Sequence, residues 1–113
     1  MYSKELIKGT LKPIILQLLS TTDRMYGYEI TQKVKEISEG KIKITEGALY
    51  PTLHRLEADG LLQTETIYIG KRVRKYYKLT EKGVDFSKEI ISKFDDFLIT
   101  MRTILNLNPG LQT

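Results

Sequence analysis

Apolar side chains repeat at helical spacing near the N-terminus. Six of them recur at steps of three and four residues and predict an amphipathic helix over about residues 4–20: Ile7, Leu11, Ile14, Ile15, Leu18 and Leu19. Pro13 leaves two alternatives, because proline has no backbone N–H. Either Thr10 caps the main helix and Pro13 lies in its first turn, or one helix runs through residue 13 with a kink.

A second helix is predicted from Tyr26, because Ile30, Val34 and Ile37 follow at helical spacing and residues 39–41 end the pattern. A third helix begins after Thr45, which is a favourable N-cap residue. Its buried face is predicted to contain Ala48, Leu49, Leu53 and Leu56.

The third helix stops at the pair Asp59-Gly60, and the pattern then changes. Residues 61–69 and 72–79 are rich in Leu, Ile, Thr, Tyr and Val, which favour strands. Gly70-Lys71 between them is a turn signal, so the two segments predict a hairpin. A helix that leads into such a hairpin is typical of a winged helix.

A last helix is predicted from its cap, Thr80, to the stop at residues 108–110. At 1.5 Å per residue it spans roughly 40 Å, whereas a compact domain of this size has a radius of gyration of about 13 Å. The helix therefore overhangs its domain and forms a two-fold dimer, unless it folds back over the first helix. The predicted dimerisation residues are Phe86, Ile90, Phe94, Phe97, Leu98, Met101, Ile104 and Leu105.

The predicted fold is α+β and mostly helical, with a winged helix-turn-helix domain over residues 1–80 and a C-terminal dimerisation helix and tail over residues 81–113. With 113 residues and 41% apolar content, one core is expected. No segment reaches the roughly 20 apolar residues of a membrane span, and residues 1–12 lack the apolar centre of a signal peptide. The absence of Cys fits a reducing compartment, so a cytoplasmic location is expected.

Positive charge is concentrated in one segment. Residues 61–83 contain six basic and two acidic side chains, whereas the rest of the chain has twelve of each sign. Such a cluster is typical of a surface that contacts phosphates. The alternative is a solubilising strand edge, because Lys on an exposed strand also prevents aggregation.

Little in the chain suggests catalysis. His54 is the only His, and no Cys is present to form a metal site with it. Asp95 and Asp96 are adjacent, so about 100° of helix rotation separates them and they cannot act as paired carboxylates. No phosphate-binding or nucleophile motif occurs. We expect no enzymatic activity, no metal and no cofactor.

Three motifs in order resemble the PadR-type transcriptional regulators over roughly residues 6–83. They are Tyr26-Gly27-Tyr28-Glu29-Ile30, then Gly47-Ala48-Leu49-Tyr50-Pro51 with Arg55-Leu56-Glu57 and Gly60-Leu61-Leu62, and finally Arg74-Lys75-Tyr76-Tyr77-Lys78-Leu79-Thr80 with Gly83. The single final helix is similar to the smaller subgroup of that family. The resemblance implies a homodimer with each third helix in a major groove of DNA and each wing beside it.

The candidate DNA-binding residues are Tyr28, Thr45, Glu46, Tyr50, His54, Arg55, Lys71, Arg72, Arg74 and Lys75. Hydroxyls and cations would contact phosphates, whereas Glu46, His54 and Arg55 would read bases. Arg55 has an alternative role as the ion-pair partner of a nearby acid. Lys75 shares a strand face with Tyr77, so its phosphate contact requires the strand to twist clear of the core.

The chain departs from the family in two places. It has no Trp near Thr66 on the first wing strand, and its wing is short. It also lacks the tryptophans that stack planar drugs in some members, so Phe94, Phe97 and Met101 either line a ligand pocket or form only the dimer core. The expected function is a homodimeric repressor of a double-stranded DNA operator, released by a small apolar effector. The alternatives are a protein-interaction module and, ranked last, an RNA-binding domain.

Overall fold

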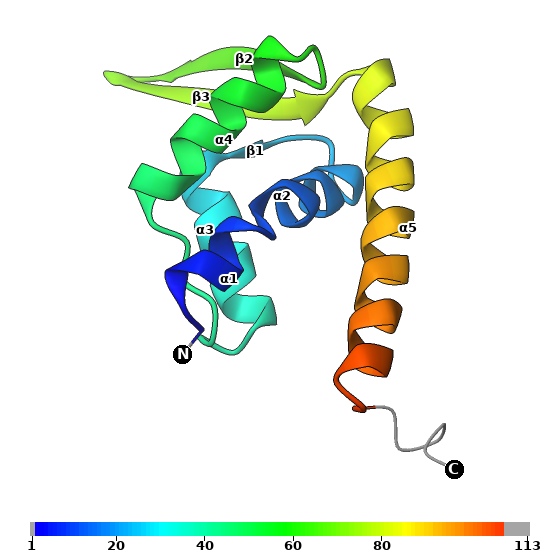
Figure 1. The fold of residues 1–113 in the computed structure, drawn as a ribbon. Coiled ribbons are helices and arrows are strands. Elements are labelled where there is room, and N and C mark those ends of the chain that lie inside the picture. Colours follow the sequence, from blue (N-terminus) through cyan, green and yellow to red (C-terminus); the bar gives the residue numbers. More distant parts are fainter. Residues whose placement is uncertain (1, 108–113) are drawn as a thin grey trace.

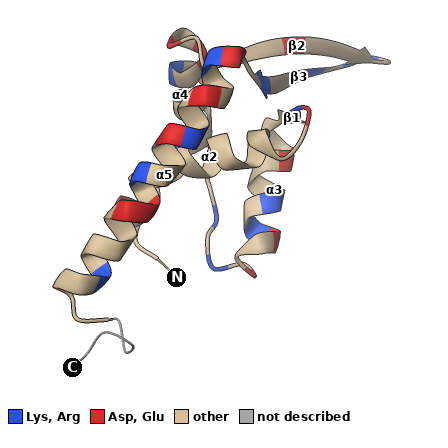
Figure 2. Cartoon of the chain, turned by 90° about the vertical axis from the view of Figure 1, so that its right-hand side faces the viewer, with Lys and Arg blue, Asp and Glu red and all other residues tan. Residues whose placement is uncertain are grey.

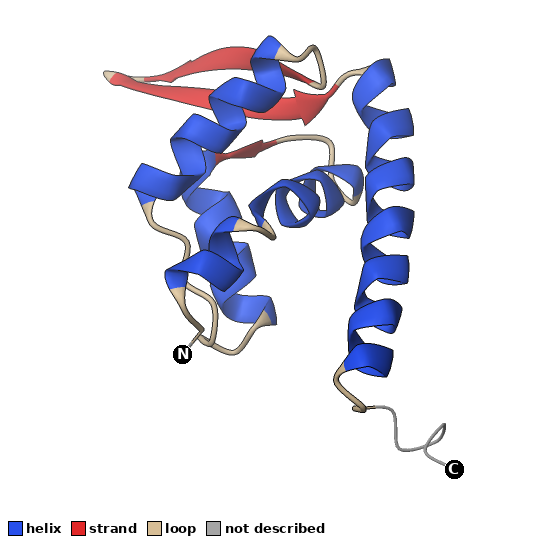
Figure 3. Ribbon diagram, viewed as in Figure 1, coloured by secondary structure: helices blue, strands red, loops and turns tan. Residues whose placement is uncertain are grey.

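The computed structural model describes residues 2–107. In chain order these residues form α1 (Lys4–Lys8), α2 (Leu11–Ser20), β1 (Met25–Tyr26), α3 (Gly27–Ile37), α4 (Glu46–Ala58), β2 (Leu62–Ile69), β3 (Arg72–Leu79) and α5 (Glu81–Ile104). The α+β, mostly helical fold predicted from the sequence is confirmed. The β2–β3 hairpin projects from one side of the molecule, and α5 stands along the opposite side (Figure 1; Figure 3).

The predicted first helix is two helices separated at Thr10. Thr10 occupies the N-cap position of α2, and its hydroxyl donates to the carbonyl oxygen of Ile7 at 2.8 Å, which closes the end of α1. Pro13 is the third residue of α2, where the missing N–H breaks no helical hydrogen bond. The alternative with Pro13 in the first turn is therefore confirmed.

The sheet has three antiparallel strands in the order β1-β3-β2. The predicted hairpin is confirmed, with Gly70 at a φ of +61° in its turn. β1 was not predicted. Its two residues pair with the middle strand, Met25 opposite Tyr77 and Tyr26 opposite Tyr76. The short strand thus joins the wing to the start of α3.

The core lies where α2, α3 and α4 meet one face of the sheet. The predicted buried face of α4 is confirmed, since Leu49, Leu53 and Leu56 are fully buried and Ala48 is half-buried. Tyr77 is 1% exposed. The buried apolar residues are Leu11, Ile15, Leu16, Leu18, Leu19, Met25, Ile30, Val34, Ile44, Leu49, Leu53, Leu56, Leu61, Leu62 and Tyr77.

The first half of α5 belongs to this core. The hydroxyl of Thr80 accepts a hydrogen bond from the Gly83 N–H at 3.0 Å, which confirms Thr80 as the predicted cap. α5 packs against α2, with Gly83 and Ser87 buried. A Cβ at residue 83 would overlap the carbonyl oxygen of Leu61, so only glycine fits this close approach.

The end of α5 comes earlier than predicted. The helix ends at Ile104, and Asn106, two residues later, adopts a φ of +57°. The N–H of Leu107 donates to the carbonyl of Arg102 at 2.8 Å, and that of Asn106 donates to Thr103 at 3.2 Å. These two bonds form a Schellman motif, a common way to end a helix. The predicted stop at Asn108-Pro109-Gly110 lies outside the described residues.

Candidate nucleic-acid interface

One face of α4 is exposed along its length. Thr45 caps the helix by accepting a hydrogen bond from the Ala48 N–H at 3.3 Å, and Glu46 lies in the first turn. His54 and Arg55 are exposed and point away from the buried leucines, whereas Glu46 is exposed as the first residue of the helix. All three residues predicted to read bases are thus accessible on α4, but Glu46 lies at its start and on a different side from Arg55.

Arg55 is available for a ligand. Within residues 2–107 it makes no ion pair with a carboxylate, although Glu57 and Asp59 are close in sequence. Glu57 instead accepts a hydrogen bond from the hydroxyl of Thr64 at 3.3 Å and lies 3.8 Å from the ammonium of Lys75. The alternative role of Arg55 as an intramolecular ion-pair partner is absent from the described part of the chain.

The N-terminal end of α4 carries cations that the sequence interpretation missed. Lys4, Lys8 and Lys43 line a depression of about 500 Å³ together with Thr45 and Gly47. The free N–H groups and the dipole of a helix N-terminus also favour an anion. No sequence pattern predicts this cluster, because Lys4 and Lys8 reach α4 only through the fold.

Two predicted tyrosines have different environments. The side chain of Tyr28, at the start of α3, is 62% exposed. Tyr50 is half-buried, and its ring packs so closely over Gly27 that a Cβ at residue 27 would overlap the phenol. The ring centroids of Tyr50 and His54 are 6.3 Å apart. Tyr50 thus fixes α3 against α4, while Tyr28 is free to meet a phosphate.

The wing tip combines charge with apolar surface. Lys71 and Arg72 are exposed and make no ion pair within the described residues. Tyr68 and Val73, which pair across the hairpin, are 74% and 60% exposed. The tip lies on the far side of the molecule from α5 (Figure 1). It is the most accessible cationic part of the hairpin.

Arg74 and Lys75 have partners within the chain. The guanidinium of Arg74 lies 4.5 Å from the ring centroid of Tyr26, and a hydrogen bond with Tyr76 raises the pKa of Arg74 above its ordinary value. The ammonium of Lys75 lies between Glu57 and the ring of Tyr77. Both residues were predicted to contact DNA, and the structure gives each of them an intramolecular role.

The predicted dimerisation residues fall into three groups. Phe86 and Ile90 pack against the core of their own chain. Phe94 and Met101 are half-buried, and farther along the chain the exposed fractions are 44–69% for Phe97, Leu98, Ile104 and the C-cap residue Leu105. The fold-back over the first helix therefore applies to the first half of α5, and the predicted overhang applies to the second. Figure 2 shows charges of both signs along α5 and a mainly uncharged last part.

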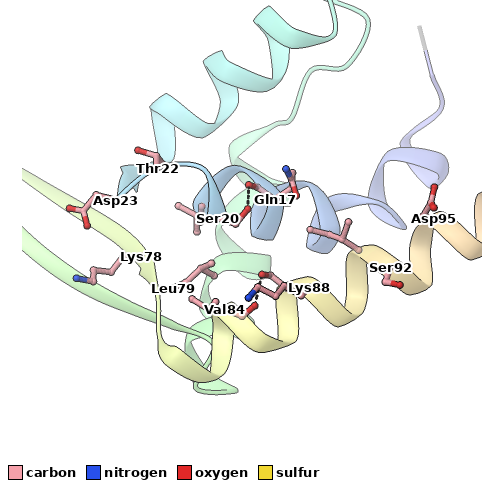
Figure 4. Close-up of a pocket in the computed structure, with 13 residues that line it drawn as sticks. Gln17, Ser20, Thr22, Asp23, Lys78, Leu79, Val84, Lys88, Ser92 and Asp95 are labelled. Carbon is pink, nitrogen blue, oxygen red and sulfur yellow. Dashed lines mark hydrogen bonds between the residues drawn. The ribbon is translucent and has the colours of Figure 1, made fainter.

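Two depressions border α5. An apolar groove of about 350 Å³ between α2, α3 and α5 includes Ile14, Val34, Ile37 and Phe94. A larger pocket of about 830 Å³ lies between α2, β3 and the first half of α5. Figure 4 shows Leu79 and Val84 in this pocket, with Lys78 and Lys88 among its polar residues. The groove and the pocket lie along the seam between the winged helix and α5.

Within residues 2–107, no group of three His, Cys, Asp or Glu side chains could hold a metal ion. No helix in this part of the chain is long and apolar enough to cross a membrane.

The fold and this surface define a winged helix-turn-helix protein with a long C-terminal helix. The model of the "Transcriptional regulator PadR-like family" matches residues 15–89, and the chain belongs to this family. A curated relative, the transcriptional regulator Rv3488 of Mycobacterium tuberculosis, is 43% identical over 61 residues, which are 54% of each chain.

Solved structures show the same fold. A PadR family transcriptional regulator from Eggerthella lenta is 31% identical with a TM-score of 0.79, over 92% of this chain and 88% of that one. Bacillus subtilis PadR in complex with operator DNA is 29% identical with a TM-score of 0.64, over 72% of this chain and 46% of that one. The matched segment thus covers about half the length of that regulator and of the curated relative.

Proposed function

We propose that the protein is a sequence-specific DNA-binding repressor that acts as a homodimer. The exposed face of α4 carries this proposal, together with two groups of cations near it and an Arg55 that makes no ion pair within residues 2–107. Lys43 lies at the N-terminal end of α4, and Lys71 and Arg72 lie at the tip of the wing hairpin that follows α4 in the chain. Two separate groups of cations suit a duplex, because phosphate backbones border the major groove on each side.

Base reading is assigned to α4 itself. An Arg side chain can donate two hydrogen bonds to guanine, and Glu can accept one from cytosine. Arg55 and Glu46 provide these groups on exposed positions of α4. Phosphates would be contacted by the cations around α4 and at the wing tip, which set the position of α4 without reading sequence. These cations are Lys4, Lys8, Lys43, Lys71 and Arg72.

The dimer is supported by the second half of α5. One side of the helix carries Phe86, Ile90, Phe97 and Ile104, because steps of four and seven residues return to nearly the same direction. The first two reach their own core, whereas the last two are 51% and 69% exposed. A second copy would cover this continuation of the apolar face, and two-fold symmetry would then present two copies of α4 about one DNA turn apart.

Release by a small, largely apolar effector completes the proposal. Such a ligand must favour one dimer geometry over another. The pocket of about 830 Å³ suits this role, because Leu79 lies at the end of the wing strand while Val84 and Ile91 lie on α5. A ligand in this pocket would contact both parts at once, and we expect it to lower affinity for specific DNA.

The test is fluorescence anisotropy with the protein's own upstream promoter DNA and with a shuffled duplex of equal length, at several salt concentrations. We expect promoter binding at least about 10³-fold tighter than shuffled binding near physiological salt. Affinity should fall steeply with salt, since roughly six to ten phosphate contacts release counterions. Equal binding to both duplexes, or binding that is insensitive to salt, would favour the protein-interaction alternative.

Two variants separate the assigned roles. Arg55→Gln should weaken promoter binding and relax the preference at one base pair, by about 1–3 kcal/mol. Lys71→Ala should weaken binding to both duplexes alike and reduce the salt slope by about one. Arg55→Gln with full promoter preference would remove Arg55 from base reading.

A further inference from the structure

Two copies of the tripeptide Arg-x-Tyr lie on neighbouring strands. The first is Arg24-Met25-Tyr26, which enters β1, and the second is Arg74-Lys75-Tyr76 in β3. Tyr26 and Tyr76 are directly opposite in the antiparallel register. Arg and Tyr two residues apart on an extended chain share a face. The register therefore gathers two arginines and two tyrosines on the sheet face opposite Tyr77.

The four side chains are interlocked. The guanidinium carbon of Arg24 lies 4.5 Å from the ring centroid of Tyr76, and that of Arg74 lies 4.5 Å from that of Tyr26. Each arginine thus stacks on the tyrosine of the other tripeptide. The two rings meet edge to face, with centroids 5.4 Å apart and planes at 79°. All four residues are half-buried.

This Arg-Tyr cluster reaches every strand and the start of α3. Arg24 also pairs with Glu65, which is opposite Tyr76 on β2. Tyr26 is the N-cap residue of α3, and its backbone N–H donates to the carboxylate of Glu29 at 3.1 Å. The cluster therefore connects both wing strands to the helix that carries Tyr28.

The outer part of the wing needs such a connection. Backbone pairing with β1 involves only Tyr76 and Tyr77, so residues 66–75 of the hairpin pair only with each other. An isolated two-stranded hairpin is marginally stable. On one face Lys75 reaches Glu57 at 3.8 Å, but an exposed ion pair contributes little. On the other face Arg74 reaches from this outer part to Tyr26.

We infer that the Arg-Tyr cluster fixes the angle of the wing, and that Arg74 is a positioning residue for DNA recognition and makes no phosphate contact. This inference rests on the proposed function, which requires the wing tip and α4 to meet one duplex together. Stacking on a ring uses the face of the guanidinium and holds it over β1. The charge of Arg74 then takes part in an intramolecular contact, while Lys71 and Arg72 at the tip contact DNA phosphates.

The test uses changes that alter no charge. Tyr26→Leu removes one stacking platform, whereas Tyr26→Phe keeps the ring and is the matched control. Tyr26→Leu should weaken promoter binding by about 5- to 30-fold, as expected for one or two lost stacking contacts. It should leave shuffled binding and the salt slope unchanged, and Tyr26→Phe should restore promoter binding. Arg74→Lys, which keeps the charge, should weaken promoter binding in the same way.

A measurement without DNA separates this inference from the proposed function. The chain has no Cys, so spin labels can be placed at Lys71→Cys on the wing tip and Gln32→Cys on α3. Pulsed electron paramagnetic resonance should give a wider distribution of the distance between the two labels in Tyr26→Leu than in Tyr26→Phe. Unchanged distributions would overturn the inference, as would an Arg74→Lys variant with full affinity. If the unsubstituted protein shows no preference for promoter DNA, the proposed function alone is overturned. The spin-label distances would still test whether the cluster fixes the angle of the wing.

Discussion

The two halves of α5 share one apolar face but have different surroundings. In the first half, Gly83 and Ser87 are buried, and Phe86 and Ile90 pack on the core. In the second half the same side of the helix carries Phe97, which is 51% exposed. The sequence pattern does not change between the halves. The difference shows that periodicity identifies the apolar face of a helix, but not whether the same chain covers that face.

Substitutions in the two halves of α5 should therefore affect different measured quantities. In the first half, a substitution changes contacts that every molecule makes with itself, so it should alter the free energy of unfolding. In the second half, a substitution changes an exposed surface, so under the proposed dimer it should alter the dimer dissociation constant.

The largest effect is expected at Gly83, in the first half. In Gly83→Ala the new Cβ overlaps the carbonyl oxygen of Leu61, which is backbone and cannot move without shifting the wing. We expect the free energy of unfolding to fall by about 3 kcal/mol, at the upper end of overpacking costs. Urea denaturation followed by circular dichroism measures this change.

Gly47 is the matched control, because a Cβ there meets nothing within 4 Å. Gly47→Ala, in the first turn of α4, should keep or raise stability by up to about 1 kcal/mol. Equal stability of both alanine variants would show that α5 does not approach Leu61 as closely as described.

The next effect concerns the second half. Leu98→Glu places a charge on the exposed apolar face, and we expect the dimer dissociation constant to rise about 100-fold, or about 2.7 kcal/mol. The unfolding transition of the monomer should stay unchanged. Sedimentation equilibrium measures the first quantity and thermal denaturation of dilute protein the second.

Two further variants test whether this effect belongs to the apolar face. Thr103→Glu adds the same charge on the other side of α5, where Thr103 is exposed, and should leave the dimer intact. Ile90→Ala should do the reverse of Leu98→Glu, lowering monomer stability by about 2 kcal/mol. A Leu98→Glu protein that remains fully dimeric would remove the second half of α5 from the interface.

The smallest effect lies near the boundary between the halves. Glu89 accepts a hydrogen bond from the ammonium of Lys93 at 2.9 Å, and this bond lowers the pKa of Glu89 below its ordinary value of 4.5. A lowered pKa stabilises the folded state above pH 4.5, and that contribution is lost as the pH falls through the folded pKa. In Glu89→Gln at low salt, the free energy of unfolding should therefore fall slightly less as the pH is lowered below 4.5. An unchanged acid profile would contradict this assignment.

Much of the fold was predictable because local signals agreed with the tertiary structure. Thr45 and Thr80 are both at helix starts, and Gly70 takes the left-handed conformation in the wing turn. β1 could not be predicted in the same way. Two residues are too few for a periodic pattern, and they form a strand only because Tyr76 and Tyr77 pair with them.

The candidate site was less predictable, because distant contacts decide which charges are available. Arg74 and Lys75 look like any cations of a basic hairpin, but Tyr26 and Glu57 engage them from other parts of the fold. Lys4 reaches the start of α4 in the folded chain, although about 40 residues of sequence separate them. The repeated Arg-x-Tyr was the one local sign of the intramolecular role of Arg74.

The exposed second half of α5 also bears on how such a regulator would respond to its own abundance. Under the proposed dimer, only paired molecules place two copies of α4 on DNA. Pairing follows mass action, so at low abundance the number of pairs rises with the square of the number of chains. A twofold change in synthesis would then give about a fourfold change in active protein. The length of one helix beyond its own domain would make operator occupancy rise more steeply than in proportion to gene expression.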